Sequence, residues 1–264
     1  MDALQKFKEA QKQSWATFIP FEIFTTASAA KLVRFADVRP GQRVLDVACG
    51  TGVAAITAAG RGAEVTGLDL TPELLARARE NAAILGRKVT WIEGDAEALQ
   101  FPDGAFDVVM SQFGHMFAPR PAVAVQEMLR VLKRGGRIAF STWPPDLFIG
   151  RMFTLVATYL PPPPVDAAPP SQWGNPDVVR QRLGDRVQDL AFDTGRMIVP
   201  TLGPAHLRGF YERHAGPVMR LVQTLQSEPA RLESFRREFE TLAVQYFEDN
   251  VLHQDYLMTR ATKV

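Results

Sequence analysis

The fold is decided by the stretch Val44-Leu45-Asp46-Val47-Ala48-Cys49-Gly50-Thr51-Gly52. Apart from Asp46, its first half is apolar and β-branched, which is typical of a buried strand, and its second half is a glycine loop. A helix of small residues is expected over residues 53–59. In such a unit the glycines let a ligand approach the backbone, and the first helical turn offers unpaired N–H donors. The stretch therefore predicts a ligand-binding loop at the carboxyl end of a strand.

Strand and helix patterns alternate on the carboxyl side of this loop. Short apolar runs predict strands over residues 43–48, 64–68, 89–93, 106–111, 137–142, 186–192 and 251–259. Helices are predicted between several of them, for example after Thr71, a suitable N-cap, and Pro72, which suits the first helical position. The runs lack strict alternation, as parallel strands covered on both faces do. The order implies a parallel sheet with right-handed crossovers. Prolines at 161–164 predict a loop or spacer.

Composition and charge narrow the class of protein. The chain has 264 residues, 46% of them apolar, and a formal net charge of +1, so we expect one α/β core with an elaboration rather than a nucleic-acid binder. Cys49 is the single cysteine, which excludes an internal disulfide and a thiolate metal cluster, so no metal is expected. No apolar run is long enough to cross a bilayer, and the first residues lack the apolar region of a signal peptide. These features predict a cytoplasmic protein.

Three acidic residues lie at the ends of the first three predicted strands. Asp69 can accept hydrogen bonds from a ribose diol, and Asp95 can accept one from the exocyclic amine of adenine. Asp46 would repel a pyrophosphate but suits a ligand with a cationic amino group and a sulfonium. The third glycine of the dinucleotide fingerprint is replaced by Ala55, which argues against a nicotinamide cofactor. We therefore expect the three carboxylates to surround one nucleoside-containing ligand.

The ordered motifs resemble the class I S-adenosylmethionine (SAM)-dependent methyltransferases, and especially the ubiquinone/menaquinone-biosynthesis type and its small-molecule relatives. The resemblance covers about residues 40–143 and is carried by residues 44–52, 67–71, 93–99, 101–107 and 127–136. It implies a Rossmann-like α/β three-layer sandwich, whose seven-stranded sheet is mostly parallel with an antiparallel last strand, plus a helical substrate cap. The implied division is an N-terminal helical cap (1–38), a SAM-binding core (39–143), and acceptor-side helices with the final strands (144–264).

The same resemblance implies the cofactor and its contacts. The cofactor would be SAM, with S-adenosylhomocysteine (SAH) as product. The glycine loop would surround the methionyl part, the ends of the next two strands would hold the ribose and adenine, and the end of the fourth strand would lie near the sulfonium. The implied cofactor-binding residues are Asp46, Ala48, Gly50, Gly52, Asp69, Leu70, Asp95, Ala96, Ser111 and Gln112.

The acceptor side is less sharply defined. His115 follows the fourth predicted strand, near the expected methyl position, and is the candidate general base, although a loop histidine bonded to backbone or solvent is the alternative. Trp15 and Phe18 could cover the acceptor or simply pack on the core. The candidate acceptor contacts are Trp15, Phe18, His115, Trp143 and Tyr211.

These features together predict a monomeric or homodimeric enzyme that transfers a methyl group from SAM to an oxygen, carbon or nitrogen atom of a small organic acceptor. A SAM-binding regulatory protein without catalysis is the first alternative, and an NAD-dependent oxidoreductase is a weaker one. A membrane-associated quinone methyltransferase stays open because of apolar residues at the N-terminus and after Trp143. A nucleic-acid methyltransferase is disfavoured by the charge. It is also disfavoured by Ser111-Gln112-Phe113-Gly114, which lacks the Asn/Asp-Pro-Pro-aromatic signature.

Overall fold

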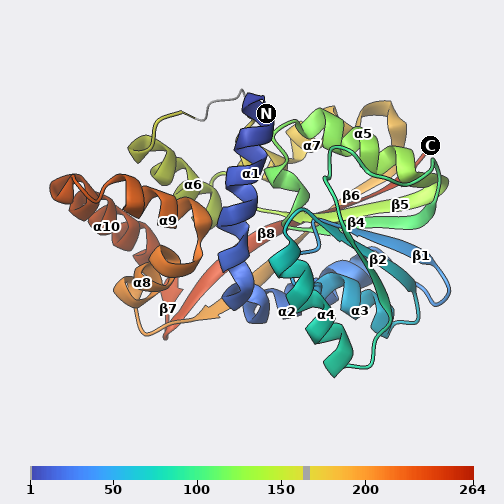
Figure 1. Ribbon diagram of the computed structural model, residues 1–264, viewed down its shortest axis with the longest axis horizontal. Helices are drawn as coiled ribbons and strands as arrows, with labels where there is room; N and C mark the ends of the chain where they lie inside the picture. Colours follow the sequence, from blue (N-terminus) through green and yellow to red (C-terminus); the bar gives the residue numbers. More distant parts are fainter. Residues whose placement is uncertain (1, 163–166) are drawn as a thin grey trace.

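The computed structural model describes residues 2–162 and 167–264, which form a sheet with helices on both faces (Figure 1). The strands are β1 (Arg43–Val47), β2 (Glu64–Asp69), β3 (Val89–Glu93), β4 (Phe106–Gln112), β5 (Leu132–Thr142), β6 (Val187–Pro200), β7 (Phe247–Glu248) and β8 (Val251–Lys263). Seven strands follow the order β3-β2-β1-β4-β5-β8-β6, and β7 pairs with β8 outside this order. β1 to β5 are parallel, whereas β8 is antiparallel to β5 and β6. The predicted Rossmann-like α/β fold is confirmed.

The helices form two layers on the sheet and a separate group beside it. They are α1 (Ala3–Trp15), α2 (Glu22–Phe35), α3 (Val53–Gly60), α4 (Pro72–Ile84), α5 (Pro121–Val131), α6 (Phe148–Tyr159), α7 (Pro176–Leu183), α8 (Pro204–His214), α9 (Gly216–Thr224) and α10 (Pro229–Val244). Short 3-10 helices are η1 (Ala16–Phe21), η2 (His115–Phe117), η3 (Pro170–Gly174) and η4 (Gly184–Arg186). In Figure 1, α2, α3 and α4 lie on one face and α5 and α7 on the other. We call α6, α8, α9 and α10 the cap helices.

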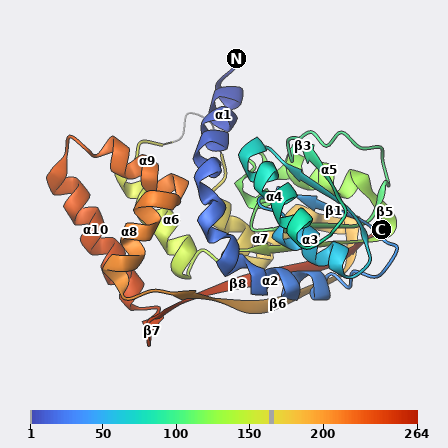
Figure 2. The same cartoon turned by 60° about the horizontal axis from the view of Figure 1, so that its bottom comes forward.

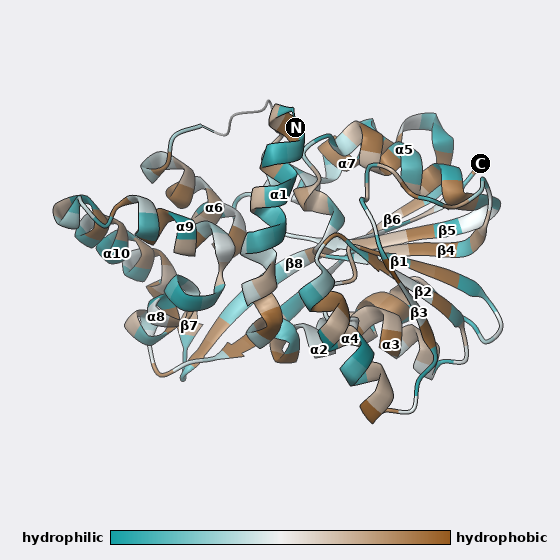
Figure 3. Cartoon of the chain, in the orientation of Figure 1, coloured by the Kyte–Doolittle hydropathy of each residue, from teal (hydrophilic) through white to brown (hydrophobic). Residues whose placement is uncertain are grey.

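Alternation along β1 divides the apolar core between the two faces of the sheet. Val44 packs with apolar residues of α2 and α3, whereas Leu45 and Val47 pack in the larger cluster on the opposite face, which continues into the cap helices. The central strands β1, β2 and β4 are accordingly drawn largely in brown, which marks hydrophobic residues, in Figure 3. By the two-residue period of a strand, Asp46 points to the same face as Val44.

β6 and β8 form a long antiparallel ribbon that joins the sheet to the cap helices (Figure 2). Their pairing runs from Val187 opposite Lys263 to Pro200 opposite Val251. Both strands extend beyond their predicted ends at residues 192 and 259 because each satisfies the backbone hydrogen bonds of the other. We call this pair the β6–β8 ribbon. The predicted proline spacer at 161–164 lies partly outside the described residues.

α1 lies between the cap helices and the core (Figure 1). Its N-terminus is closed by a capping box in which Asp2 and Gln5 exchange side-chain and backbone hydrogen bonds of 2.7 and 3.2 Å. None of its residues is fully buried, so α1 covers the molecule rather than forming part of its core. Across the described residues, no helix combines the length and the apolar character that a membrane crossing requires.

Candidate active site

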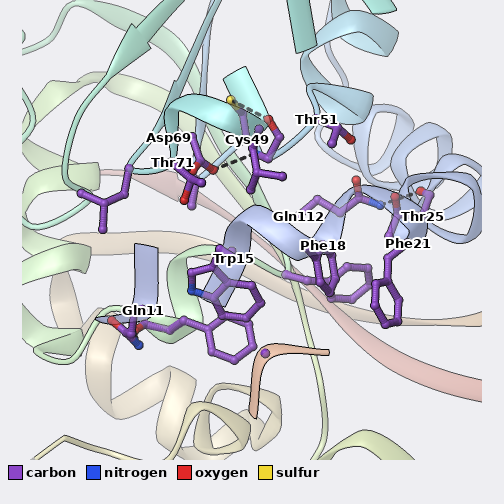
Figure 4. A pocket seen from close by; sticks show the side chains of 18 of the residues that line it. Gln11, Trp15, Phe18, Phe21, Thr25, Cys49, Thr51, Asp69, Thr71 and Gln112 are labelled. Atoms are coloured by element: carbon purple, nitrogen blue, oxygen red, sulfur yellow. Dashed lines mark hydrogen bonds between the residues drawn. The ribbon is translucent and has the colours of Figure 1, made fainter. Parts of the chain in front are cut away.

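A cavity lies at the carboxyl ends of β1, β2 and β4, beneath α1 and next to the cap helices. Seven of the ten predicted cofactor-binding residues line it, and we call them the polar wall: Ala48, Gly50, Asp69, Leu70, Asp95, Ala96 and Gln112. The opposite side, the apolar wall, is formed mainly by Trp15, Phe18, Phe21, Phe117, Trp143 and Met197. In Figure 4 the rings of Trp15, Phe18 and Phe21 lie across the cavity from Asp69, Cys49 and Thr71.

The glycine loop turns sharply between β1 and α3. Ala48, Gly50 and Gly52 all have positive φ angles, of 55°, 56° and 79°. A Cβ atom on Gly50 would meet nothing within 4 Å, so the loop backbone is open on that side. Gly52 does not line the cavity, and a Cβ there would lie 2.5 Å from the Trp91 ring. Gly50 thus keeps the backbone accessible to a ligand, whereas Gly52 is required for packing.

Asp69 connects the end of β2 to the glycine loop. One carboxylate oxygen accepts the Gly50 N–H at 2.7 Å, and the other accepts the Thr71 N–H at 2.8 Å. The carboxylate is largely buried yet lies on the polar wall. Burial raises the pKa of Asp69, and the two backbone N–H groups oppose that shift. Each oxygen retains a lone pair that can accept a ligand hydroxyl.

Asp46 lies behind the glycine loop and does not line the cavity. Its side chain is fully buried, and neither carboxylate oxygen has a hydrogen bond of normal geometry among the described residues. Burial raises the pKa of Asp46 to about 8, while the N–H of Ala55 acts in the opposite direction. Of the three acids expected to surround one ligand, Asp69 and Asp95 therefore line the cavity and Asp46 does not. The cause is strand alternation, which turns Asp46 toward α3.

Asp95 lies on the polar wall, where it is held by the N-terminal helix. Lys8 of α1 donates to Asp95 Oδ2 at 2.5 Å and to Glu97 Oε2 at 2.6 Å. Asp95 Oδ1 accepts the Glu97 N–H at 2.9 Å. A second lysine of the same helix, Lys12, pairs with Glu93 at 2.6 Å. These ion pairs fasten α1 over the part of the cavity next to Asp95.

Ser111 and Gln112 end β4 but have different surroundings. Ser111 is fully buried and does not line the cavity; its hydroxyl donates to Val47 O at 2.7 Å and accepts the His115 N–H at 3.0 Å. Gln112 lines the polar wall, and its amide donates to Thr25 O and Ser28 Oγ, both at 2.8 Å. Ser111 therefore shapes the turn after β4, whereas Gln112 faces the cavity.

The structure does not bring His115 to the cavity. The ring is 1% exposed and lies against Phe140 and Trp173, with centroids 4.6 and 4.8 Å away. Neither ring nitrogen has a hydrogen bond among the described residues. Burial, helped by the charge of Arg182, lowers the pKa of His115 to about 3, so the ring is neutral near pH 7. A base must reach the proton it removes, and this position corrects the expectation that His115 faces the acceptor.

The other four predicted acceptor contacts all lie on the cavity wall. Trp15 packs against Phe117 at 4.6 Å between centroids, and Phe18 stacks on Phe21 at 4.4 Å. Trp143 lines the apolar wall and Tyr211 lines the same side from α8. Sequence reasoning missed Lys8 of α1 and Met197, Val199 and Gln254 of the β6–β8 ribbon, which also line the cavity. Gln254 had no distinguishing signal, because it stands between two other polar residues of its strand, His253 and Asp255.

The residues of the polar wall fit SAM. Asp69 offers acceptors for a ribose diol, and Gly50 leaves open space where a side chain would obstruct a ligand. Asp46 supplies a buried acid without a hydrogen bond behind the loop, which a nearby cationic amino group would stabilise. The described residues contain no group of three His, Cys, Asp or Glu side chains placed to hold a metal ion.

Comparison with known proteins places this arrangement in a family. A profile of the family described as "Methyltransferase domain" matches residues 44–136. An uncharacterized protein of Mycobacterium tuberculosis is 38% identical over 233 residues, which cover 88% of this chain and 85% of that protein. The demethylmenaquinone methyltransferase of Thermus thermophilus is 45% identical over 106 residues, which cover 39% of this chain and 48% of that protein.

A solved structure gives the same fold over the whole chain. The Haemonchus contortus phosphoethanolamine N-methyltransferase 2, in complex with phosphomonomethylethanolamine and SAH, superposes with a TM-score of 0.63 at 17% identity. The superposition covers 100% of this chain and 60% of that one. The fold and the cavity at the strand ends define a Rossmann-like nucleoside-binding protein. The chain belongs to the class I SAM-dependent methyltransferases.

Proposed function

We propose that this enzyme transfers the methyl group of SAM to a small organic acceptor bound against the apolar wall. The observation that carries this proposal is that one cavity has the polar wall, which fits SAM, on one side and a wall of aromatic side chains on the other. Under this proposal residues 39–143 bind the cofactor. Residues 1–38 and 144–264 supply most of the acceptor compartment.

When bound, SAM supplies a methyl group on a positively charged sulfur. The acceptor's lone pair would form the new bond to the methyl carbon while the carbon–sulfur bond breaks and its electrons stay on sulfur to give SAH. The acceptor proton would be lost to bulk solvent when the product leaves the cavity. The chain would contribute alignment and exclusion of water rather than covalent chemistry. Asp69 would orient the ribose, and Trp15 and Phe18 would close the cavity over the reacting atoms.

The first test separates an enzyme from a binding protein. The chain is incubated with SAM carrying a labelled methyl group and with a small-molecule extract of bacterial cells, and SAH binding is measured by calorimetry. We expect SAH to bind and the label to appear in extracted small molecules. Binding without label transfer would favour the non-catalytic alternative, and binding of NADH instead of SAH would favour the oxidoreductase.

A variant of Asp69 tests the proposed cofactor contact. Asp69→Asn replaces one acceptor oxygen by an NH₂ group that faces a backbone N–H, so we expect SAH to bind at least about tenfold more weakly. The matched control is Asp185→Asn, because Asp185 is exposed and does not line the cavity. Unchanged SAH affinity in Asp69→Asn would contradict the assigned role.

A further inference from the structure

The acceptor side of the cavity contains one buried polar pair. Tyr211 of α8 and Gln254 of β8 both line the cavity and are 3% and 2% exposed. The Tyr211 hydroxyl accepts a hydrogen bond from Gln254 Nε2 at 2.7 Å. Burial raises the pKa of Tyr211, so its hydroxyl remains protonated at neutral pH. The pair joins the cap helices to the β6–β8 ribbon at the cavity wall.

The Tyr211–Gln254 pair leaves two donors and one acceptor unused, one of the donors being the second N–H of the Gln254 amide. The Tyr211 proton is free once the hydroxyl oxygen has accepted from Gln254, and within residues 2–162 and 167–264 the Gln254 carbonyl oxygen takes no hydrogen bond. Rotating the amide by 180° would make Tyr211 the donor, and the free groups would then be the hydroxyl oxygen and the amide NH₂. In both orientations the pair can bind a group that donates and accepts, and a hydroxyl does both.

Among the residues that the structure describes, no unpaired charge faces an acceptor on this side of the cavity. The charged residues that line the cavity are Lys8, Glu22, Asp69 and Asp95. Lys8 pairs with Asp95, and Glu22 pairs with Arg77 at 2.5 Å, while Asp69 accepts two backbone N–H groups. A charged acceptor placed among the aromatic rings would lose its hydration without gaining a counter-ion.

We infer that the acceptor is an uncharged, largely apolar ring compound carrying a hydroxyl group that the Tyr211–Gln254 pair binds and orients. This inference rests on the proposed function and specifies its substrate class. The aromatic side chains of the apolar wall, such as Trp15, Phe18 and Trp143, line the cavity and suit a flat apolar partner. The described lining includes no histidine, so the pair positions the hydroxyl and does not remove its proton.

The test measures binding of four matched probes to the full chain saturated with SAH. The probes are naphthalene, 2-naphthol, 2-naphthoate and 2-naphthylmethylammonium, which share a ring system and differ in polarity and charge. We expect 2-naphthol to bind about tenfold more tightly than naphthalene and both charged probes to bind more weakly than 2-naphthol. The measurement is isothermal titration calorimetry.

Variants connect this preference to the pair. Tyr211→Phe and the double variant Tyr211→Phe/Gln254→Leu should reduce the advantage of 2-naphthol over naphthalene to within about twofold. The double variant removes both polar partners together, which avoids a buried unsatisfied amide and protects the fold. Tyr159→Phe is the matched control, because the Tyr159 hydroxyl bonds Glu238 at an exposed position.

The outcomes separate the two proposals. An equal or tighter affinity for a charged probe, an unchanged hydroxyl preference in the double variant, or no binding of any probe to the SAH complex would overturn the inference while leaving the proposed function standing. Failure of SAH itself to bind would overturn the proposed function.

Discussion

The buried carboxyl group of Asp46 makes the stability of the ligand-free protein depend on pH. Its folded-state pKa of about 8 exceeds the ordinary value of 3.8. The folded protein therefore keeps a proton that the unfolded chain releases, so the favourable contribution is complete below pH 3.8 and is lost as the pH rises to about 8. At 1.36 kcal/mol per pKa unit, the loss between pH 5 and pH 8 is on the order of 4 kcal/mol.

Asp46→Asn removes this titration. The free energy of unfolding is measured by urea denaturation at pH 5, 6, 7 and 8. Between pH 5 and pH 8 it should decrease by about 4 kcal/mol more in the wild type than in the variant. The Asn amide has no partner, which costs about 1–3 kcal/mol at every pH, so the slope is compared rather than the offset. Asp185→Asn should retain the wild-type slope. Parallel curves for the wild type and Asp46→Asn would refute the reasoning.

Binding of SAH should change the pH dependence that Asp46 gives to the free energy of unfolding. The cationic amino group of SAH, if bound near Asp46, favours the ionised carboxylate and lowers the pKa of that group. Saturating SAH should therefore flatten the pH dependence of the wild type and leave Asp46→Asn unaffected. An equal effect of SAH on both proteins would show that Asp46 and the ligand do not interact.

Three further substitutions test the placement of other residues. His115→Leu replaces a buried ring that has no hydrogen bond by an apolar side chain. The free energy of unfolding should therefore change by less than about 1 kcal/mol, and the affinity for SAH by less than about twofold. A large loss of SAH affinity would restore a role for His115 in the site. Gly114→Ala places a Cβ 2.4 Å from a backbone oxygen and should lower the free energy of unfolding, measured by urea denaturation, by about 2–4 kcal/mol. The control is Gly209→Ala, which lies in a helix interior and should not lower the free energy of unfolding. Lys8→Met breaks two ion pairs of α1, so chymotrypsin should cleave that helix about threefold or more faster; Lys6→Met is the control, and equal rates would contradict the fastening role.

Much of the fold could be predicted because its elements are encoded locally. The parallel strands carry continuous apolar runs, and α4 begins at Pro72 after Thr71, as predicted, because proline suits the first helical position. α7 was not predicted, because it has only eight residues. Its two buried side chains, Val179 and Leu183, give a weak periodic signal.

The candidate site could be predicted only where a residue's direction follows from its place at a strand end. Asp69 and Asp95 reach the cavity because each directly ends or follows a strand. Asp46 lies inside its strand, so the alternation of side chains along the strand decides which face of the sheet it points to. That face could have been worked out by counting residues along the strand. His115 lies two residues after Phe113, whose positive φ of 58° has no local sequence signal, so its burial could not be predicted.

The β6–β8 ribbon has a consequence for how enzymes of this kind diversify. The segment 201–250, with α8, α9 and α10, is a single connection between two paired strands, and the ribbon itself carries Met197, Val199 and Gln254 into the cavity. Such a connection can be lengthened, shortened or exchanged during evolution without altering the strand order or the glycine loop. Under the proposed function, the choice of molecule to be methylated can therefore drift in this half of the gene while the residues that bind the methyl donor are inherited intact.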